Sequence, residues 1–160
     1  MHRSLCSRFV PALAFFALLV SAPANLSAQD APPADRKKLE AELQELQQQI
    51  QTLKQNPQID RSLLADVEIY AKAAEWILRH KEFYKPQYVK ETYQVLETGR
   101  QRASQLAAGK PEWTDPKGTV LFGYYSKIDG SVQPYPLTFP EDLKHQPTQR
   151  WPLHVKLMGQ

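Results

Sequence analysis

The chain has 160 residues, with 20 Lys and Arg against 17 Asp and Glu, and its only cysteine is Cys6. This length suits one small domain, and a single cysteine excludes an internal disulfide. The nearly balanced charge lacks the basic excess typical of nucleic-acid-binding proteins, so we expect no nucleic-acid partner.

Residues 1–28 have the order of a secretory signal peptide. Arg3 and Arg8 precede an apolar run over residues 9–20, and two small-residue triplets, Ala22-Pro23-Ala24 and Leu26-Ser27-Ala28, are possible cleavage sites. The run is shorter than the roughly 20 residues that span a bilayer. We predict cleavage after Ala28 and export to the periplasm or outside the cell, with no membrane attachment afterwards; a retained anchor is the alternative.

Residues 29–34 are predicted to form a short flexible leader, because they contain two prolines and small residues, and a helical segment is predicted over 35–109. In the first helix, apolar residues recur at alternating spacings of four and three, the seam of a coiled coil. The members of this seam are Leu39, Leu43, Leu46, Ile50 and Leu53. Two interpretations remain open: self-association of two chains through this seam, and an intramolecular helical hairpin.

Two further helices are predicted in this segment. Asp60 is a good N-cap for a helix that runs to about Lys81 and carries a broad apolar stripe, typical of a buried face. A third helix should begin near Pro86 and end at Gly109. Gly99 inside it either permits close helix approach or marks a weak spot.

Residues 110–160 are predicted to be rich in β-structure. Residues 118–128 favour a strand, and Asp129-Gly130 favours a type I′ hairpin turn. Pro134 and Pro136 make the returning run, 131–139, an edge or irregular strand. Alternating apolar and polar residues predict a third strand over 152–158. The predicted fold class is therefore α+β, with three helices followed by a hairpin and a third strand.

The sequence holds no complete catalytic or metal site. It has no G-x-S-x-G elbow, and His80, His145 and His154 lack the spacing of metal ligands. Paired acids such as Asp66 and Glu68 are explained by solvated helix faces. We therefore predict no catalytic residue, no metal and no cofactor.

The aromatic residues either line a binding groove or belong to the core. Trp76, Trp113 and Trp151 are the three tryptophans, and large aromatic side chains at helical spacing favour the core interpretation.

One stretch, residues 125–140, reads Y-S-K-I-D-G-S-V-Q-P-Y-P-L-T-F-P. It resembles the entry hairpin of secreted bacterial α/β-hydrolases of the esterase and prolyl-oligopeptidase type. Residues 64–70 and 75–80 resemble the helical segment that precedes this hairpin, so the resemblance covers most of residues 60–160. It implies that the strands are the beginning of an incomplete α/β-hydrolase sheet.

In that family, backbone amides after the next strand help to form an oxyanion hole. The matching positions are Met158, Gly159 and Gln160; Gly159 fits, whereas Met158 stands where histidine is usual. The nucleophile, acid and base of the family lie beyond the matched region. We therefore expect an N-terminal fragment or accessory region of an exported serine hydrolase that acts on ester or peptide bonds and is not catalytically competent alone. The alternative is a small exported coiled-coil protein that dimerises through the seam of the first helix.

Overall fold

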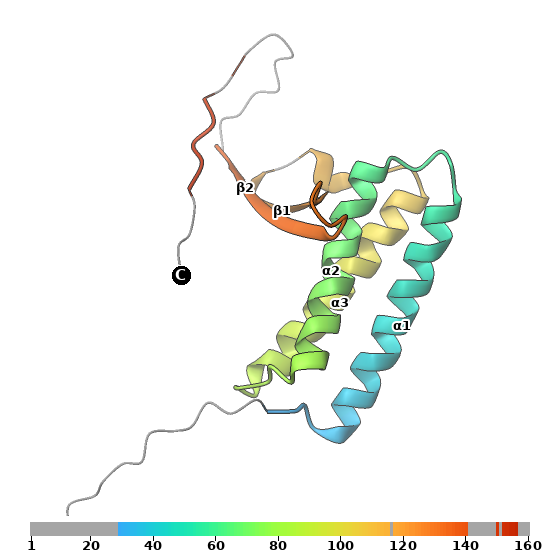
Figure 1. Ribbon diagram of the computed structural model, residues 1–160, viewed down its shortest axis with the longest axis vertical. Coiled ribbons are helices and arrows are strands. Elements are labelled where there is room, and N and C mark those ends of the chain that lie inside the picture. Colours follow the sequence, from blue (N-terminus) through green and yellow to red (C-terminus); the bar gives the residue numbers. More distant parts are fainter. Residues whose placement is uncertain (1–28, 116, 141–149, 151, 157–160) are drawn as a thin grey trace, which may run out of the picture.

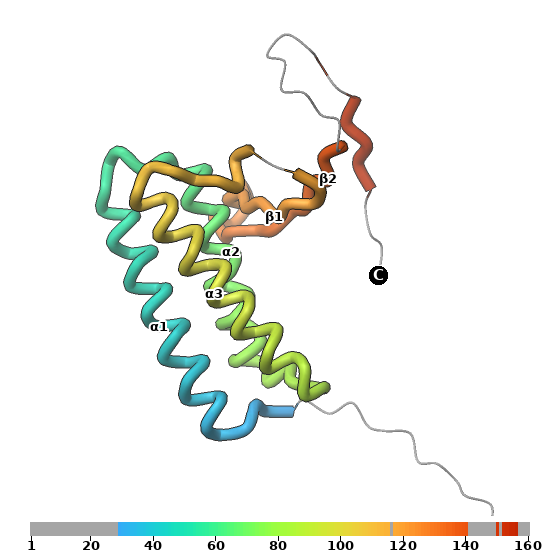
Figure 2. Tube along the Cα trace, turned by 180° about the vertical axis from the view of Figure 1, so that it is seen from behind, coloured from blue at the N-terminus to red at the C-terminus, as the bar shows by residue number. Residues whose placement is uncertain are grey.

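The computed structural model describes residues 29–115, 117–140, 150 and 152–156. Three antiparallel helices form a bundle, and a β-hairpin lies across one end of it (Figure 1). Figure 2 shows from behind that this is the end where α1 leads into α2 and where α3 ends. In chain order the elements are α1 (Pro33–Gln55), α2 (Arg61–His80), α3 (Gln87–Ala107), the 3-10 turn η1 (Glu112–Thr114), β1 (Gly118–Tyr125) and β2 (Val132–Phe139). This arrangement confirms the α+β class.

The seam of α1 forms the centre of the bundle core. All five predicted seam residues are buried, and α1 packs against both α2 and α3. The intramolecular interpretation therefore describes how this chain buries its seam. No described part of the seam is left free for a second chain.

The helix begins earlier than predicted. Pro33 occupies its first turn, where a missing N–H costs no hydrogen bond. Ahead of it, Ala31 is buried and Gln29 pairs with Glu82, so the described segment that we expected to be a flexible leader is docked on the bundle.

Helix α2 contacts every other major element. Its N-cap is Asp60, as predicted, whose carboxylate accepts a hydrogen bond of 2.8 Å from Ser62 N–H. It ends at His80, and its C-cap, Lys81, has a positive φ of 56°. One face joins the bundle core, and a second face, formed by Ala65, Asp66 and Ile69, is buried at the contact with β1.

Close approach of the helices depends on Gly99 in α3. A β-carbon there would lie 2.7 Å from a methyl carbon of Leu46 and 2.9 Å from the β-carbon of Tyr70. Of the two readings of this glycine, close helix approach is confirmed. The helix ends as predicted, with Gly109 at a φ of 68° just beyond its last turn.

The strands β1 and β2 pair along eight residues, from Gly118 opposite Phe139 to Tyr125 opposite Val132. The type I′ prediction is wrong, because Asp129 does not have positive φ and the turn is wider. Ser126 N–H donates to Ser131 C=O at 2.8 Å, and Gly130 alone adopts the left-handed conformation, with φ 71°.

The predicted third strand does not form in the described part of its range. Residues 152–156 have no regular secondary structure, and Leu153 and Val155 are 74% and 71% exposed. The sheet described here therefore has two strands. Met158, Gly159 and Gln160, the oxyanion-turn candidates, lie outside the described residues.

Candidate functional site

A buried polar cluster fastens the hairpin to the helices. The Asp66 carboxylate on α2 accepts hydrogen bonds from Gly123 N–H on β1, at 2.6 Å, and from Trp113 Nε1–H, at 2.9 Å. Asp66 is only 3% exposed, and burial raises its carboxyl pKa while these two hydrogen bonds oppose the increase. Each carboxylate oxygen thus holds a different segment that follows α3.

Arg102 on α3 completes the cluster. Its guanidinium donates to the main-chain oxygens of Asp66, at 3.1 Å, and Leu121, at 2.8 Å. The group lies 5.0 Å from the ring centres of both Tyr70 and Trp113, a cation–π arrangement on two sides. Burial lowers the Arg102 pKa. We call Asp66, Arg102 and Trp113 the hairpin latch.

The latch also occupies one edge of the sheet. Gly123 N–H and Leu121 C=O point away from β2, because both bond to helix side chains. Their partners in β2 are Pro134 and Pro136, which therefore stand at positions where no N–H is needed for the ladder. This explains how β2 is regular despite its two prolines.

The outer edge of β2 also lacks a regular row of free backbone groups. Pro134 and Pro136 offer no N–H there, and Lys72 Nζ donates to Val132 C=O at 2.6 Å. Neither edge of the hairpin is thus a regular row of unpaired groups, which is how natural sheets avoid edge-to-edge pairing.

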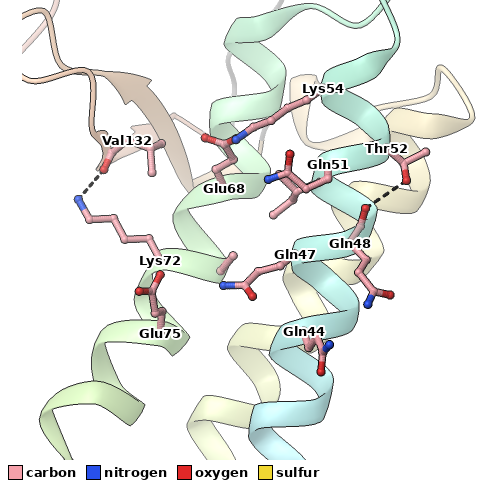
Figure 3. Close-up of a pocket in the computed structure, with 12 residues that line it drawn as sticks. Gln44, Gln47, Gln48, Gln51, Thr52, Lys54, Glu68, Lys72, Glu75 and Val132 are labelled. Carbon is pink, nitrogen blue, oxygen red and sulfur yellow. Dashed lines mark hydrogen bonds and ion pairs between the residues drawn. The ribbon is translucent and has the colours of Figure 1, made fainter.

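A polar groove of about 700 Å³ lies between α1 and α2, beside Val132 of the hairpin (Figure 3). Four glutamines of α1 line one side: Gln44, Gln47, Gln48 and Gln51. Lys54 bridges the groove to Glu68, with 2.5 Å between Nζ and Oε1. Burial, together with the carboxylate of Glu68, raises the pKa of Tyr125. The charged groups are thus used within the chain, and the groove walls bring no nucleophile together with a base.

Aromatic side chains gather on the face of the hairpin that carries alternate residues Phe122, Tyr124, Tyr135 and Phe139. Phe122 stacks on Tyr135 with ring centres 5.8 Å apart, and Tyr124 meets Tyr135 edge-on at 5.9 Å. Tyr124 is 51% exposed and Tyr135 is 37% exposed, whereas Phe122 and Phe139 are partly buried and Phe122 packs against the core. We call these four residues the aromatic surface.

The other candidates from the sequence have structural surroundings. Trp113 is buried, as the core interpretation predicts, whereas Trp76 is half exposed and contradicts it. His80 lies beside Trp76, with ring centres 5.3 Å apart. Asp129 accepts hydrogen bonds from Ser131 and so shapes the turn. Hydrogen bonding with Ser126 and with Ser131 lowers the pKa of its carboxyl group. Among the described residues, no group of acidic, histidine or cysteine side chains could hold a metal ion.

The latch is the feature that sequence reasoning missed. Asp66 is interpreted from the sequence as part of a solvated helix face, but it is buried. The available signal was its position between Ala65 and Val67 in an otherwise apolar stretch. A carboxylate in such a place needs donors, and none are supplied by its own helix.

Within the described part of the chain, no helix is long and apolar enough to cross a membrane. Comparisons with models of known protein families, with curated proteins and with solved structures found no match. The observed fold and surfaces define an α+β domain in which a three-helix bundle carries a latched hairpin.

Proposed function

We propose that this chain is a non-catalytic accessory domain of an exported serine hydrolase acting on ester or peptide bonds. Its role is to present the hairpin, and the segment that follows it, to the catalytic domain. The observation that carries this proposal is the concentration of exposed apolar side chains on the hairpin and after it, while the helical bundle has its own closed core.

The aromatic surface supports a docking role. Tyr124 and Tyr135 combine a large apolar ring with a polar hydroxyl, the composition found at protein interfaces. Contiguous exposed apolar groups mark interaction sites, because covering them contributes about 25 cal/mol for each Å² removed from water. Leu153 and Val155 add further exposed apolar side chains downstream.

The latch supports a rigid presentation of that surface. Asp66 and Arg102 hold β1 by its backbone, so the hairpin is fixed before any partner binds. A preformed surface loses less conformational entropy on binding than a mobile one. Because both hairpin edges are occupied or blunted, we place the hairpin beside the hydrolase sheet rather than within it. Residues 152–156, which have no regular secondary structure, are then the first described segment available to that sheet.

The sequence resemblance of residues 125–140 supplies the class of partner. Acyl transfer would need a nucleophile, a base and an oxyanion hole, and the catalytic domain would supply the first two. The 160 residues contain no G-x-S-x-G nucleophile elbow. This is why the proposed role is accessory.

The test begins with the DNA that follows codon 160. We expect a frame, in phase or shifted, that encodes a G-x-S-x-G turn followed by Asp and His. The region it encodes is then produced separately from residues 29–160, and both are treated with a fluorophosphonate, which labels activated serines. We expect the fluorophosphonate to label only the downstream region. We also expect calorimetry to show that the downstream region binds residues 29–160.

Tyr135→Ser should weaken this binding by about tenfold or more, as expected for an aromatic residue at an interface centre. Tyr84→Ser is the matched control, because Tyr84 is equally exposed, at 37%, but lies between α2 and α3. The proposal is overturned by the lack of a hydrolase frame, by a downstream hydrolase that does not bind residues 29–160, or by label on residues 29–160 themselves.

A further inference from the structure

The first described residue, Gln29, is also the residue that follows the predicted cleavage site. Its main-chain oxygen accepts a hydrogen bond of 3.1 Å from Phe83 N–H, in the connection between α2 and α3. The next residue, Asp30, forms ion pairs with Arg36 and with Lys81. Ala31 is then buried against the core. The mature N-terminus is thus held on the bundle from its first residue.

The hydrogen bond between Gln29 and Phe83 does not involve the two groups that a ring closure would join. This hydrogen bond uses the carbonyl oxygen of Gln29, and the residue is exposed to solvent. After cleavage, the α-amine and the side-chain carboxamide would belong to the same terminal residue. An α-amine has a pKa of about 7.7–8.0, so an appreciable fraction is neutral and nucleophilic near neutral pH.

We propose that Gln29 is a modification site, at which the mature chain is closed to an N-terminal pyroglutamate. The α-nitrogen attacks Cδ of the side chain, a new N–Cδ bond forms, and the bond from Cδ to the amide nitrogen breaks. That nitrogen leaves as ammonia after taking up a proton from the α-amine. The product is a neutral five-membered lactam, and the step needs no oxidant, reductant or further reactant. This inference rests on the export that forms part of the proposed function.

The surroundings of Gln29 favour the neutral product. The residue lines a cleft of about 570 Å³ whose apolar walls include Phe83, Pro86 and Val89. A neutral lactam ring can pack on such walls. Two cations, Arg36 and Lys81, already share Asp30. Lys85 and Lys90 line the same cleft with Asp35, so cations outnumber carboxylates around the terminus and ring closure removes one further positive charge. Ring closure leaves the carbonyl of Gln29 unchanged, and its hydrogen bond with Phe83 is retained.

The test is mass spectrometry of the full-length protein after expression with its own residues 1–28 in an exporting host. Trypsin should release residues 29–36, which end at Arg36. We expect this peptide to be lighter by one ammonia than the linear sequence, and the intact protein to resist stepwise aminopeptidase digestion. A synthetic linear peptide processed in parallel measures any cyclisation during preparation.

Gln29→Asn is the matched variant, since asparagine keeps the carboxamide but could close only a strained four-membered ring. It should be cleaved at the same place, keep the linear mass and lose resistance to aminopeptidase. A linear Gln29 terminus in the wild type would overturn the modification and leave export intact. A terminus at Met1 would overturn both the modification and the export on which it rests, and a terminus at any other residue would overturn the modification.

Discussion

The carboxylate of Asp66 on α2 accepts a hydrogen bond of 2.6 Å from the backbone N–H of Gly123 on β1, 57 residues further along the chain. The contact replaces the strand partner that this edge of β1 lacks. It therefore joins the two layers of the domain through a backbone group of the strand and a charged acceptor on the helix.

Asp66→Ala should loosen the hairpin from the bundle. The change leaves Gly123 N–H and Trp113 Nε1–H buried without an acceptor, at a cost of about 1–3 kcal/mol for each donor. Chemical denaturation would measure the lost free energy of unfolding. Trp113→Phe is the comparison, because it removes one donor and keeps a large ring, and it should cost less. Equal stability of Asp66→Ala and the wild type would contradict the role of the latch.

The contributions of Asp66 and Asp60 to the free energy of unfolding should change with pH in opposite directions. Burial raises the folded-state pKa of Asp66, so the folded chain binds its proton more tightly than the unfolded chain, and its contribution to stability grows as pH falls through that raised value. Hydrogen bonds from Ser62 lower the pKa of Asp60, so its contribution is present above the unfolded-state pKa and is lost as pH falls through the folded-state value.

Unfolding free energies of the wild type, Asp66→Asn and Asp60→Asn, measured between about pH 3 and pH 7, would resolve the two contributions. The difference between wild type and Asp66→Asn should shift in favour of the wild type towards acid. The difference for Asp60→Asn should shift the other way. The same sign for both variants would mean that one of the two environments is misassigned.

Gly123→Ala should displace β1 from α2. The added methyl carbon would lie 2.3 Å from the main-chain oxygen of Ala65, and helix backbone cannot move aside as a side-chain end can. We expect a loss of about 1–3 kcal/mol, with faster exchange of the amide hydrogen at position 123. Gly99→Ala has a flexible Leu46 methyl as its nearest contact and gains helix propensity, so it should cost less. The reverse order would show that the helices, and not the hairpin, have the tighter packing.

Leu46→Ala should destabilise the bundle of each single chain. Leu46 is fully buried between the helices, and its truncation should cost about 2–5 kcal/mol. Gln47→Ala, one position along on an exposed surface, should change stability by less than about 0.5 kcal/mol. Both melting temperatures should be independent of protein concentration. A midpoint that rises with concentration in the wild type, and not in Leu46→Ala, would instead favour association through the seam.

Restoring hydrogen-bond donors to the outer edge of β2 should promote aggregation. In the double variant Pro134→Thr and Pro136→Thr, two N–H groups would point outward from a regular strand, and such edges pair with other chains. Light scattering during incubation at moderate temperature would detect the increase. The control is Gln133→Thr, which adds a residue that favours strands but no new outward N–H, and it should leave scattering unchanged. Equal scattering from the wild type, the double variant and the control would contradict a protective role for the prolines.

The helices and the strand pair could be predicted because their signals are local. The spacing of the seam, Asp60 at an N-cap and Gly109 beyond a helix end depend on residues a few positions apart. The same is true of the run of β-branched and aromatic residues that favours β1. The candidate site could not be found in this way, because Asp66, Arg102 and Trp113 come from three separate elements and carry no shared spacing.

The amino-acid sequence by itself determined three helices, a hairpin and the lack of an internal nucleophile elbow, since periodicity, capping and motifs are read along the chain. Only the tertiary structure decided that the seam of α1 is covered by α2 and α3, that Asp66 is buried rather than solvated, and that the hairpin edges are closed. The physical reason is that an apolar stripe or an unpaired strand edge specifies a need for a partner but not which partner meets it. That choice depends on the close approach permitted at Gly99 and Gly123, where a β-carbon would collide with a neighbouring helix.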